Sequence, residues 1–338
     1  MNRRELLTTG AAALGVGVVN HLVSRGLSEA TALASSPPLG APSVTVIPVK
    51  AGSLAQMITV GSGLAFATNT DRSQVEVFDL VKRKRLTPIL VGSLPLGIDA
   101  TPDGKRLIVC NSGGANVSIV SLTKRKEIKK IFTPSGTSND TPFSVAVAAN
   151  GKALLSTTFS GSGFGATMLE IDLETLKVKE REDFGSTTEV TRLRASGDRK
   201  RIAVIQGDIS SGPVYRYNSA KDKFDREHDT AAFLDYVAID HRGGHIIAGP
   251  GTFVFDAELR QMGTIAGNGY GLAISPGGGT AYRMQQDHIE VLDVARFRVR
   301  RRISLPEPPN EGAQLALTPD GGTLLAATES GLTVATVR

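Results

Sequence analysis

The sequence predicts an all-β protein in which seven similar four-stranded units close into a ring. The first reason is an internal repeat, because Thr-Pro-Asp-Gly occurs at residues 101–104 and again at 318–321, with degenerate copies between them. The second reason is that short apolar or alternating runs of strand length flank the copies. A repeat of about 40 residues is typical of circular or stacked folds, since each unit buries its apolar faces against its neighbours.

Residues 95–131 show the order of events within one unit. The repeated phrase forms a tight turn, because proline fixes φ, aspartate bonds its own backbone and glycine accepts a positive φ. Ile98–Ala100 leads into this turn, and Leu107–Cys110 follows it as a continuous apolar run, typical of a strand covered on both faces. Val117–Leu122 alternates as a third strand, and Glu127–Ile131 predicts a polar outer strand. Four short antiparallel strands in about 40 residues match one blade of a β-propeller.

The same order recurs along the rest of the chain. The other third strands are expected at Val75–Leu80, Met168–Leu173, Val214–Tyr217, Thr252–Asp256, Ile289–Asp293 and Leu332–Val337. The last unit lacks a fourth strand of its own. We expect Val44–Val49 to supply it, which would close the ring and remove an exposed sheet edge.

The repeat pattern resembles the YVTN-type β-propeller repeat. It runs Pro-x-Gly, an apolar pair, Thr-Pro-Asp-Gly, Lys or Arg, Leu-x-Val, Asn and then a Val/Ile-Asp-Leu strand. The resemblance covers nearly everything after residue 44 and is strongest in the second unit. It implies a seven-bladed ring related to the lactonase-like propeller superfamily, and little about activity, because the motif residues form turns and core.

Residues 1–34 predict an export signal. Twin arginines, Arg3 and Arg4, precede an apolar stretch that ends in an Ala-x-Ala cleavage site at Ala32–Ala34. This resembles a twin-arginine signal, with a Sec signal or an uncleaved anchor as the open alternatives. Glycines dilute the stretch, so we expect no permanent membrane span after cleavage and a periplasmic or secreted protein.

Three segments follow from these patterns: the signal at 1–34, a flexible Pro-rich leader at 35–43, and the propeller at 44–338. The composition is that of an ordinary soluble protein, with 41% hydrophobic and 5% aromatic residues and a formal charge of +5. This modest charge does not by itself indicate nucleic acid.

Cys110 is the single cysteine, which excludes an intramolecular disulfide, and it is expected to be a buried, inert thiol. Histidine does not recur from unit to unit, so no metal and no cofactor are predicted.

Candidate site residues lie where the inner strands begin and the second strands end, around one mouth of the central channel. Four of them are candidate catalytic groups for acid/base chemistry: Glu189, Asp235, Tyr236 and Tyr270. Six others are candidate ligand-binding residues for a polar small molecule: Gln56, Asn111, Asn268, Arg283, Glu311 and Gln314. The alternative interpretation is that these polar groups only hydrate the channel.

Basic runs are expected at the turns between third and fourth strands, on the outer rim of one side of the ring. The residues assigned to this basic rim are Lys82, Arg83, Lys84, Arg85, Arg300, Arg301 and Arg302, with a similar run at Lys124–Lys126. Two interpretations stay open. In the first, the charges on the outer strands prevent edge-to-edge pairing with other sheets. In the second, the basic rim binds an anionic surface. Nucleic acid is disfavoured, because interleaved aromatic residues for base stacking are nearly absent.

The leading functional hypothesis is an exported, non-catalytic binding protein or scaffold that recognises a protein or an anionic polymer. One alternative is an enzyme of the lactonase, hydrolase or lyase type, with its site at the channel mouth. Another is an accessory protein of a periplasmic redox system. The repeat itself does not distinguish them, because its residues build turns. We expect a monomer.

Overall fold

The structure is a computed structural model that describes residues 43–49, 52–133, 141–158, 166–310, 312 and 314–337. The predicted export signal, nearly all of the predicted leader, and Glu311 lie outside these residues. Every strand described below lies within Ala41–Arg338, which forms one compact unit.

The described residues form 28 strands in seven antiparallel sheets of four, with one 3₁₀ turn, η1 (Thr70–Arg72). Blade 1 holds β2 (Leu54–Val60), β3 (Leu64–Asn69), β4 (Gln74–Asp79) and β5 (Lys84–Leu90); blade 2 holds β6 (Pro95–Ala100), β7 (Arg106–Asn111), β8 (Asn116–Ser121) and β9 (Lys126–Phe132). Blade 3 holds β10 (Thr141–Val147), β11 (Lys152–Thr158), β12 (Met168–Asp172) and β13 (Val178–Glu180); blade 4 holds β14 (Thr191–Ala195), β15 (Arg201–Gln206), β16 (Pro213–Asn218) and β17 (Lys223–Asp229). Blade 5 holds β18 (Tyr236–Ile239), β19 (His245–Gly249), β20 (Phe253–Asp256) and β21 (Gln261–Thr264); blade 6 holds β22 (Leu272–Ile274), β23 (Thr280–Met284), β24 (His288–Asp293) and β25 (Arg298–Ser304). Blade 7 holds β26 (Leu315–Leu317), β27 (Thr323–Thr328), β28 (Gly331–Thr336) and β1 (Val44–Pro48).

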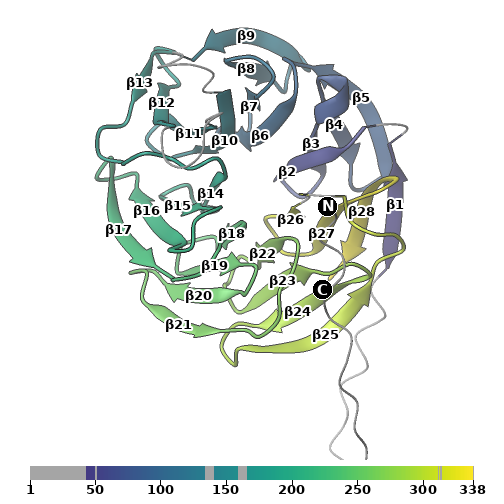
Figure 1. Ribbon diagram of the computed structural model, residues 1–338. Helices are drawn as coiled ribbons and strands as arrows, with labels where there is room; N and C mark the ends of the chain where they lie inside the picture. The colour runs from purple at the N-terminus through teal and green to yellow at the C-terminus, as the bar shows by residue number, and fades with distance from the viewer. Residues whose placement is uncertain are drawn as a thin grey trace, which may run out of the picture. The chain divides into compact units, whose positions relative to one another are not determined.

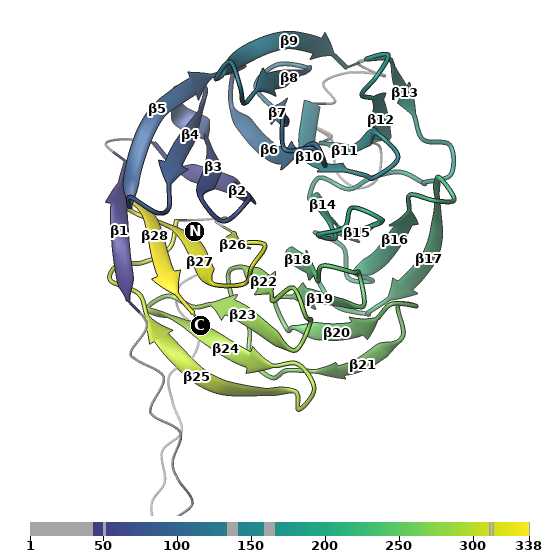
Figure 2. The same ribbon diagram turned by 180° about the vertical axis from the view of Figure 1, so that it is seen from behind.

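The blades stand side by side in a ring, which confirms the predicted seven-bladed propeller. The first strand of each blade lies next to the centre and the fourth strand lies on the outside, as Figures 1 and 2 show from opposite sides. We call the side where the inner strands begin the mouth face. The opposite side, which carries the turns from first to second and from third to fourth strands, is the turn face.

The repeated Thr-Pro-Asp-Gly forms the predicted turn between first and second strands. Gly104 has a φ of 64° and donates its N–H to the carbonyl of Thr101 at 2.8 Å. The Thr101 hydroxyl donates to Asp103 at 2.6 Å, and Asp103 accepts the N–H of Lys105 at 3.0 Å. Residues 318–321 repeat this geometry, with a φ of 71° at the glycine and the same threonine–aspartate distance. The sequence repeat is therefore a repeated hydrogen-bonding unit.

The N-terminal strand closes the ring, as predicted. β1 pairs antiparallel with β28, from Val44 opposite Ala335 to Pro48 opposite Gly331. Ile47 is buried in this strand, whereas Thr45, nearer its start, is exposed. The last blade thus receives its fourth strand from the other end of the propeller.

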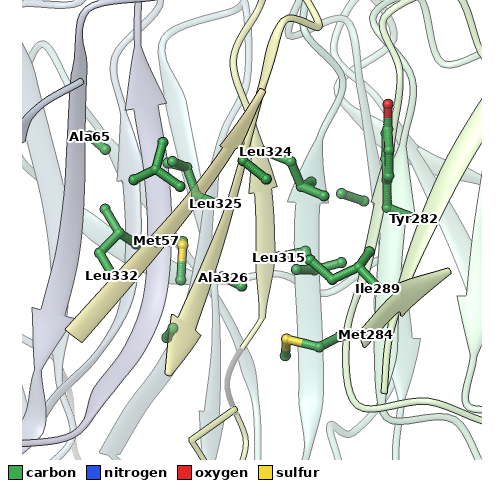
Figure 3. Close-up of a cluster of buried hydrophobic side chains, with 14 of the residues drawn as sticks. Met57, Ala65, Tyr282, Met284, Ile289, Leu315, Leu324, Leu325, Ala326 and Leu332 are labelled. Carbon is green, nitrogen blue, oxygen red and sulfur yellow. The ribbon is translucent and has the colours of Figure 1, made fainter. Parts of the chain in front are cut away.

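Hydrophobic clusters between neighbouring blades hold the ring together. Figure 3 shows one that joins blades 6, 7 and 1, where Met284 of β23, Leu315 of β26 and Met57 of β2 belong to one buried set. Further clusters join blades 1 and 2, 2 and 3, 3 and 4, 4 and 5, and 5 and 6. Because each sheet is covered on both faces, middle strands such as β7 carry a continuous apolar run, here Leu107–Cys110.

Candidate functional site

A hollow on the mouth face brings together four of the predicted site residues. It has a volume of about 620 Å³ and lies over blades 5 to 7. Asp235 and Tyr236 at the start of β18, and Asn268 and Tyr270 before β22, contribute to its lining. Gln285 joins them and donates to the Asn268 carbonyl at 2.6 Å. The hollow presents a carboxyl, two phenols and amides, which suits hydrogen bonding to a polar ligand.

Asp235 is the most perturbed acid in this hollow. Burial raises the pKa of its carboxyl, the nearby Asp208 carboxylate raises it further, and the Arg192 guanidinium opposes both. The carboxylate that acts electrostatically on Asp235 is therefore Asp208. Glu189 lies exposed in the loop before β14 and does not line the hollow. Sequence reasoning missed Asp208, which follows the end of β15 with a φ of 58°.

Replacing Asp235 by asparagine is expected to raise the melting temperature at pH 7. The reason is that a raised pKa means the folded state holds the proton more tightly, so the ionised carboxyl costs stability as pH rises through the folded pKa. Below the unfolded pKa of about 3.9 both states are protonated, and the advantage of the variant should vanish. Thermal unfolding of both proteins between pH 3.5 and 7 checks this, and a variant less stable at pH 7 would contradict it.

Arg192 on β14 stands between two aromatic rings at the mouth of the channel. Its guanidinium carbon lies 5.2 Å from the ring centre of Phe143 on β10 and 5.9 Å from that of Tyr236 on β18. Burial lowers its pKa, which Tyr236, Asp235 and Asp208 partly offset. Two cation–π contacts therefore fix a positive charge where three blades meet.

A cavity of about 270 Å³ occupies the central channel. Residues of all seven inner strands line it, mostly with apolar side chains. Arg194, two residues after Arg192, is its most polar inner-strand group, and its Nη1 donates to Gln56 Oε1 and to the Leu193 carbonyl, both at 3.3 Å. Burial, and to a smaller extent the nearby Arg192, lower the pKa of Arg194 to about 10 against the opposing effect of Asp99. The sequence analysis did not select either arginine of β14. Two arginines spaced two residues apart in an inner strand could have indicated them.

Arg199, the second arginine that lines this cavity, is paired with an acid. Asp99 on β6 accepts the N–H groups of Ala100 and Val147 at 2.8 and 2.7 Å and pairs with the Arg199 guanidinium. Arg199 has a φ of 62°, in the turn position where blades 2 and 7 carry glycine. Its ion pair with Asp99 therefore spans three blades and leaves Arg194 as the excess charge of the channel.

Two predicted ligand-binding residues are structural in the folded protein. The Arg283 guanidinium is buried, pairs with Glu290 at 2.7 Å and donates to carbonyls of the loop before β22. Asn111 is buried at the end of β7 and donates to Asn116 and Ser118. Gln314 is buried beside β26, and Gln56 reaches Arg194 across the channel.

The basic rim differs in part from the expectation. Lys82 and Arg83 lie in the turn between β4 and β5, but Arg300, Arg301 and Arg302 lie inside the outer strand β25 and not at its turn. Arg83 donates to Thr336 of blade 7 at 3.2 Å, and Arg85 pairs with the buried Glu76 at 2.6 Å. Arg83 and Arg85 therefore connect elements within the fold, whereas Lys82 and Lys84 are exposed.

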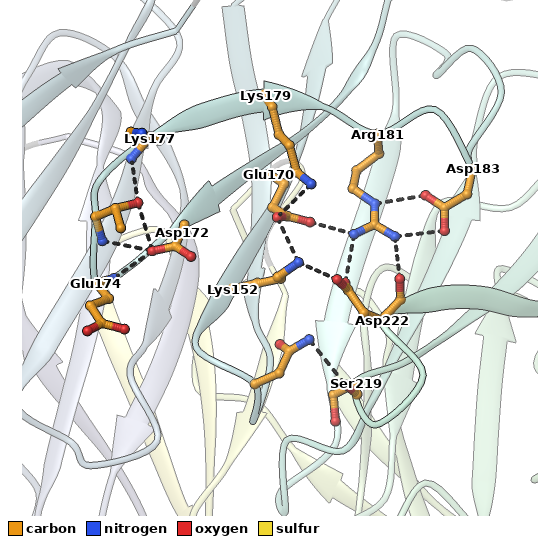
Figure 4. Close-up of polar contacts among 12 residues, drawn as sticks. Lys152, Glu170, Asp172, Glu174, Lys177, Lys179, Arg181, Asp183, Ser219 and Asp222 are labelled. Atoms are coloured by element: carbon orange, nitrogen blue, oxygen red, sulfur yellow. Dashed lines mark hydrogen bonds and ion pairs between the residues drawn. The ribbon is translucent and has the colours of Figure 1, made fainter.

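The largest charged cluster outside the channel joins blades 3 and 4 (Figure 4). Arg181 lies between Glu170 of β12 and the acids Asp183 and Asp222, bonding Asp183 at 2.7 and 2.8 Å. Lys152 lies 3.0 Å from Glu170 and also pairs with Asp222. Each charge has an opposite partner, so we interpret the cluster as a clamp between blades.

Other reactive groups do not assemble into a site. No three His, Cys, Asp or Glu side chains in the described ranges gather closely enough to hold a metal ion. Cys110 is buried, and burial raises the pKa of its thiol, as for an inert thiol.

Comparison with known proteins supports the fold only. No protein-family model matches the chain, and no curated protein matches it. A solved structure described as Kuenenia stuttgartiensis hydrazine synthase matches with a TM-score of 0.70 and 17% identity, over 86% of this chain and 97% of that one. At this identity the likeness shows a shared propeller fold and nothing of activity. Among the described residues, no helix is long and apolar enough to cross a membrane.

Proposed function

We propose that this chain is an exported, non-catalytic propeller that binds an anionic polymer along its turn face. Export rests on the twin arginines and cleavage pattern of residues 1–34. Binding rests on one observation: exposed basic residues recur at equivalent positions in blades 6, 1 and 2, which lie on one side of the ring.

These positions are the first residues of the outer strands. Lys84, Lys126 and Arg298 begin β5, β9 and β25, opposite the last residues of the third strands. All three are exposed, and none forms a salt bridge within the described ranges. Blade 7, between blades 6 and 1, begins its outer strand with the uncharged Val44, so these three charges lie on one side of the ring with a gap at blade 7. We call Lys84, Lys126 and Arg298 the basic arc. In blades 3 and 5 the equivalent residues are Val178 and Gln261, which carry no charge.

The arrangement favours a partner with repeated negative charge. Protection of edges would need charge on every outer strand, but net positive charge is confined to β5, β9 and β25 on one side of the ring, whereas β13, β17, β21 and β1 have none. Extended polyanions gain affinity from several spaced cations through counterion release, which makes binding steeply dependent on salt.

Charge reversal in the basic arc is expected to abolish most polyanion binding. The triple variant Lys84→Glu, Lys126→Glu and Arg298→Glu should bind dextran sulfate at least about tenfold more weakly, and should lower the slope of log Kd against log salt by about three. Titration at several salt concentrations measures both quantities, with uncharged dextran as the ligand control.

Lys223→Glu is the matched protein control. Lys223 begins β17 of blade 4 at the equivalent position, but this strand also carries Asp225, Glu227 and Asp229 and has no net positive charge. It should leave binding unchanged. Equal weakening by Lys223→Glu, or binding that does not depend on salt, would exclude the basic arc as the contact surface.

A hydrolytic function is the second candidate, and the Asp235–Asp208 pair favours it. Two neighbouring carboxyls with one raised pKa suit general acid chemistry at the mouth-face hollow. In that case Asp235→Asn should remove turnover of lactone substrates by about 10²-fold or more while the fold persists. Unchanged turnover, or none in the parent protein, would leave the binding function as the better account.

A further inference from the structure

Unpartnered hydrogen-bond donors gather at the mouth end of the central channel. Four nitrogen atoms there are buried without an acceptor among the described residues: Gln56 Nε2, Arg192 Nε, Arg194 Nη2 and Gln314 Nε2. All four atoms donate, and none accepts. A buried donor without an acceptor is costly, so a set of four in one region indicates a ligand that brings acceptor oxygens.

Strand register places these groups at neighbouring levels of the channel. Leu193 and Leu315 occupy equivalent places, opposite Val204 and Ala326 of their second strands. Arg192 and Gln314 precede them and therefore share a level, and Gln56 precedes Met57 at the equivalent place in blade 1. Arg194 lies two residues further along β14, toward the turn face, but its Nη1 is 3.3 Å from Gln56 Oε1.

The channel carries an excess of positive charge. Among the ionisable groups that line the cavity, Asp99 is paired with Arg199, and His241 lies beyond β18 toward the turn face. Arg194 has no acidic partner within salt-bridge distance in the described ranges, and Arg192 adds a second positive charge nearby. A guanidinium without an acidic partner, with a second guanidinium nearby, favours an anion in the channel.

The walls around Arg194 are small and apolar. Where blade 4 carries Arg194, blades 5, 6 and 7 carry Ala238, Ala273 and Ala316, and all three line the cavity. Ile274 and Leu317 continue the apolar wall toward the turn face. Such a wall leaves room for a hydrocarbon group and offers little to a fully hydrated anion such as phosphate.

We propose that the central channel binds a small organic monocarboxylate, with its carboxylate on Arg194 and Gln56 and its apolar part against Ala273 and Ala316. Nη2 of Arg194 and Nε2 of Gln56 supply two donors for the two carboxylate oxygens. The proposal is independent of the basic arc, since the two sites share no residue.

A ligand series tests the two halves of this site. Acetate, butyrate and hexanoate are titrated by calorimetry and thermal shift up to about 10 mM, the range of a weak small-molecule site. Affinity should rise by about fourfold per methylene, as expected for burial of hydrocarbon. Hexanamide and inorganic phosphate should bind at least about tenfold more weakly than hexanoate, because one lacks the charge and the other lacks the apolar part.

Three variants locate the binding. Arg194→Gln removes the charge and should weaken hexanoate at least about tenfold. Ala316→Leu fills the apolar side and should also abolish binding without altering any charge. Arg201→Gln is the matched control, since Arg201 belongs to the same blade, lies outside the cavity and donates to the Gly243 carbonyl at 2.7 Å.

Stability without ligand provides a second readout. Arg194→Gln should raise the melting temperature of the ligand-free protein, because it removes an uncompensated buried charge, and should eliminate the shift that hexanoate produces. At a hundredfold excess over Kd, hexanoate should raise the melting temperature of the parent protein by about 5 °C. The proposal is overturned if no carboxylate binds, if hexanamide or phosphate binds as tightly as hexanoate, or if Arg194→Gln leaves hexanoate affinity unchanged.

Discussion

Replacing Arg283 by methionine is expected to destabilise the protein by about 3–5 kcal/mol, because it leaves the largely buried Glu290 without its partner. The guanidinium also donates to the Thr252 hydroxyl of blade 5 and to the carbonyls of Ile265 and Ala266, at 3.1, 3.1 and 2.7 Å. These acceptors belong to blade 5 and to the connection into blade 6. The substitution therefore loosens a junction between blades as well as an ion pair. Urea unfolding followed by circular dichroism measures the change in free energy.

Two further variants separate the causes of this effect. Arg298→Met removes an exposed arginine of the same blade and should change stability by less than about 0.5 kcal/mol. Adding Glu290→Leu to Arg283→Met should recover part of the loss, because the unpaired carboxylate is then removed. If Arg283→Met costs no more than Arg298→Met, the buried pair does not hold the junction.

Ile47→Ala is expected to cost about 2–4 kcal/mol, the second large effect. Ile47 is 2% exposed and packs in the cluster shared by blades 6, 7 and 1, next to β28. Truncation removes buried hydrocarbon and leaves a cavity in a tightly packed site. The loss occurs in the strand that closes the ring, so we also expect the edge of β28 to exchange amide hydrogens faster.

Thr45→Ala is the control in the same strand. Thr45 is exposed and pairs with Val334, and its truncation should change stability by less than about 0.5 kcal/mol. Equal costs for the two substitutions would mean that β1 is held by backbone pairing alone and not by its buried side chain.

The fold was predictable because its signals are local and repeated. Thr101–Gly104 specifies its turn through contacts within six residues, and the same chemistry at Thr318–Gly321 predicts the same turn. The expected third strands agree with β4, β8, β12, β16, β20, β24 and β28 within one residue at nearly every end. Closure by Val44–Val49 followed from the physical cost of an unpaired edge.

The candidate site was predicted only in part. Asp235, Tyr236, Asn268 and Tyr270 were placed at one mouth because they begin inner strands, and they line one hollow. Arg283 and Asn111 shared that pattern but are buried among protein partners, since a strand end can point into a blade as well as out of it. Arg192, Arg194 and Asp208 were missed. The sequence does not distinguish a charged residue that faces the channel from one that is exposed to solvent when both lie inside or just after a strand.

The number of blades, their turns and the strand that closes the ring can be read from the sequence, since these depend on residues close together in the chain or on a repeated pattern. Which charges meet depends on the three-dimensional arrangement of the blades. Arg194 reaches Gln56 across 138 positions of sequence, and Arg199 pairs with Asp99 across 100. Such contacts depend on which strands the ring brings around one axis and on which alternate side chains face it. A pattern along the chain does not encode that choice, because both sides of a blade are buried.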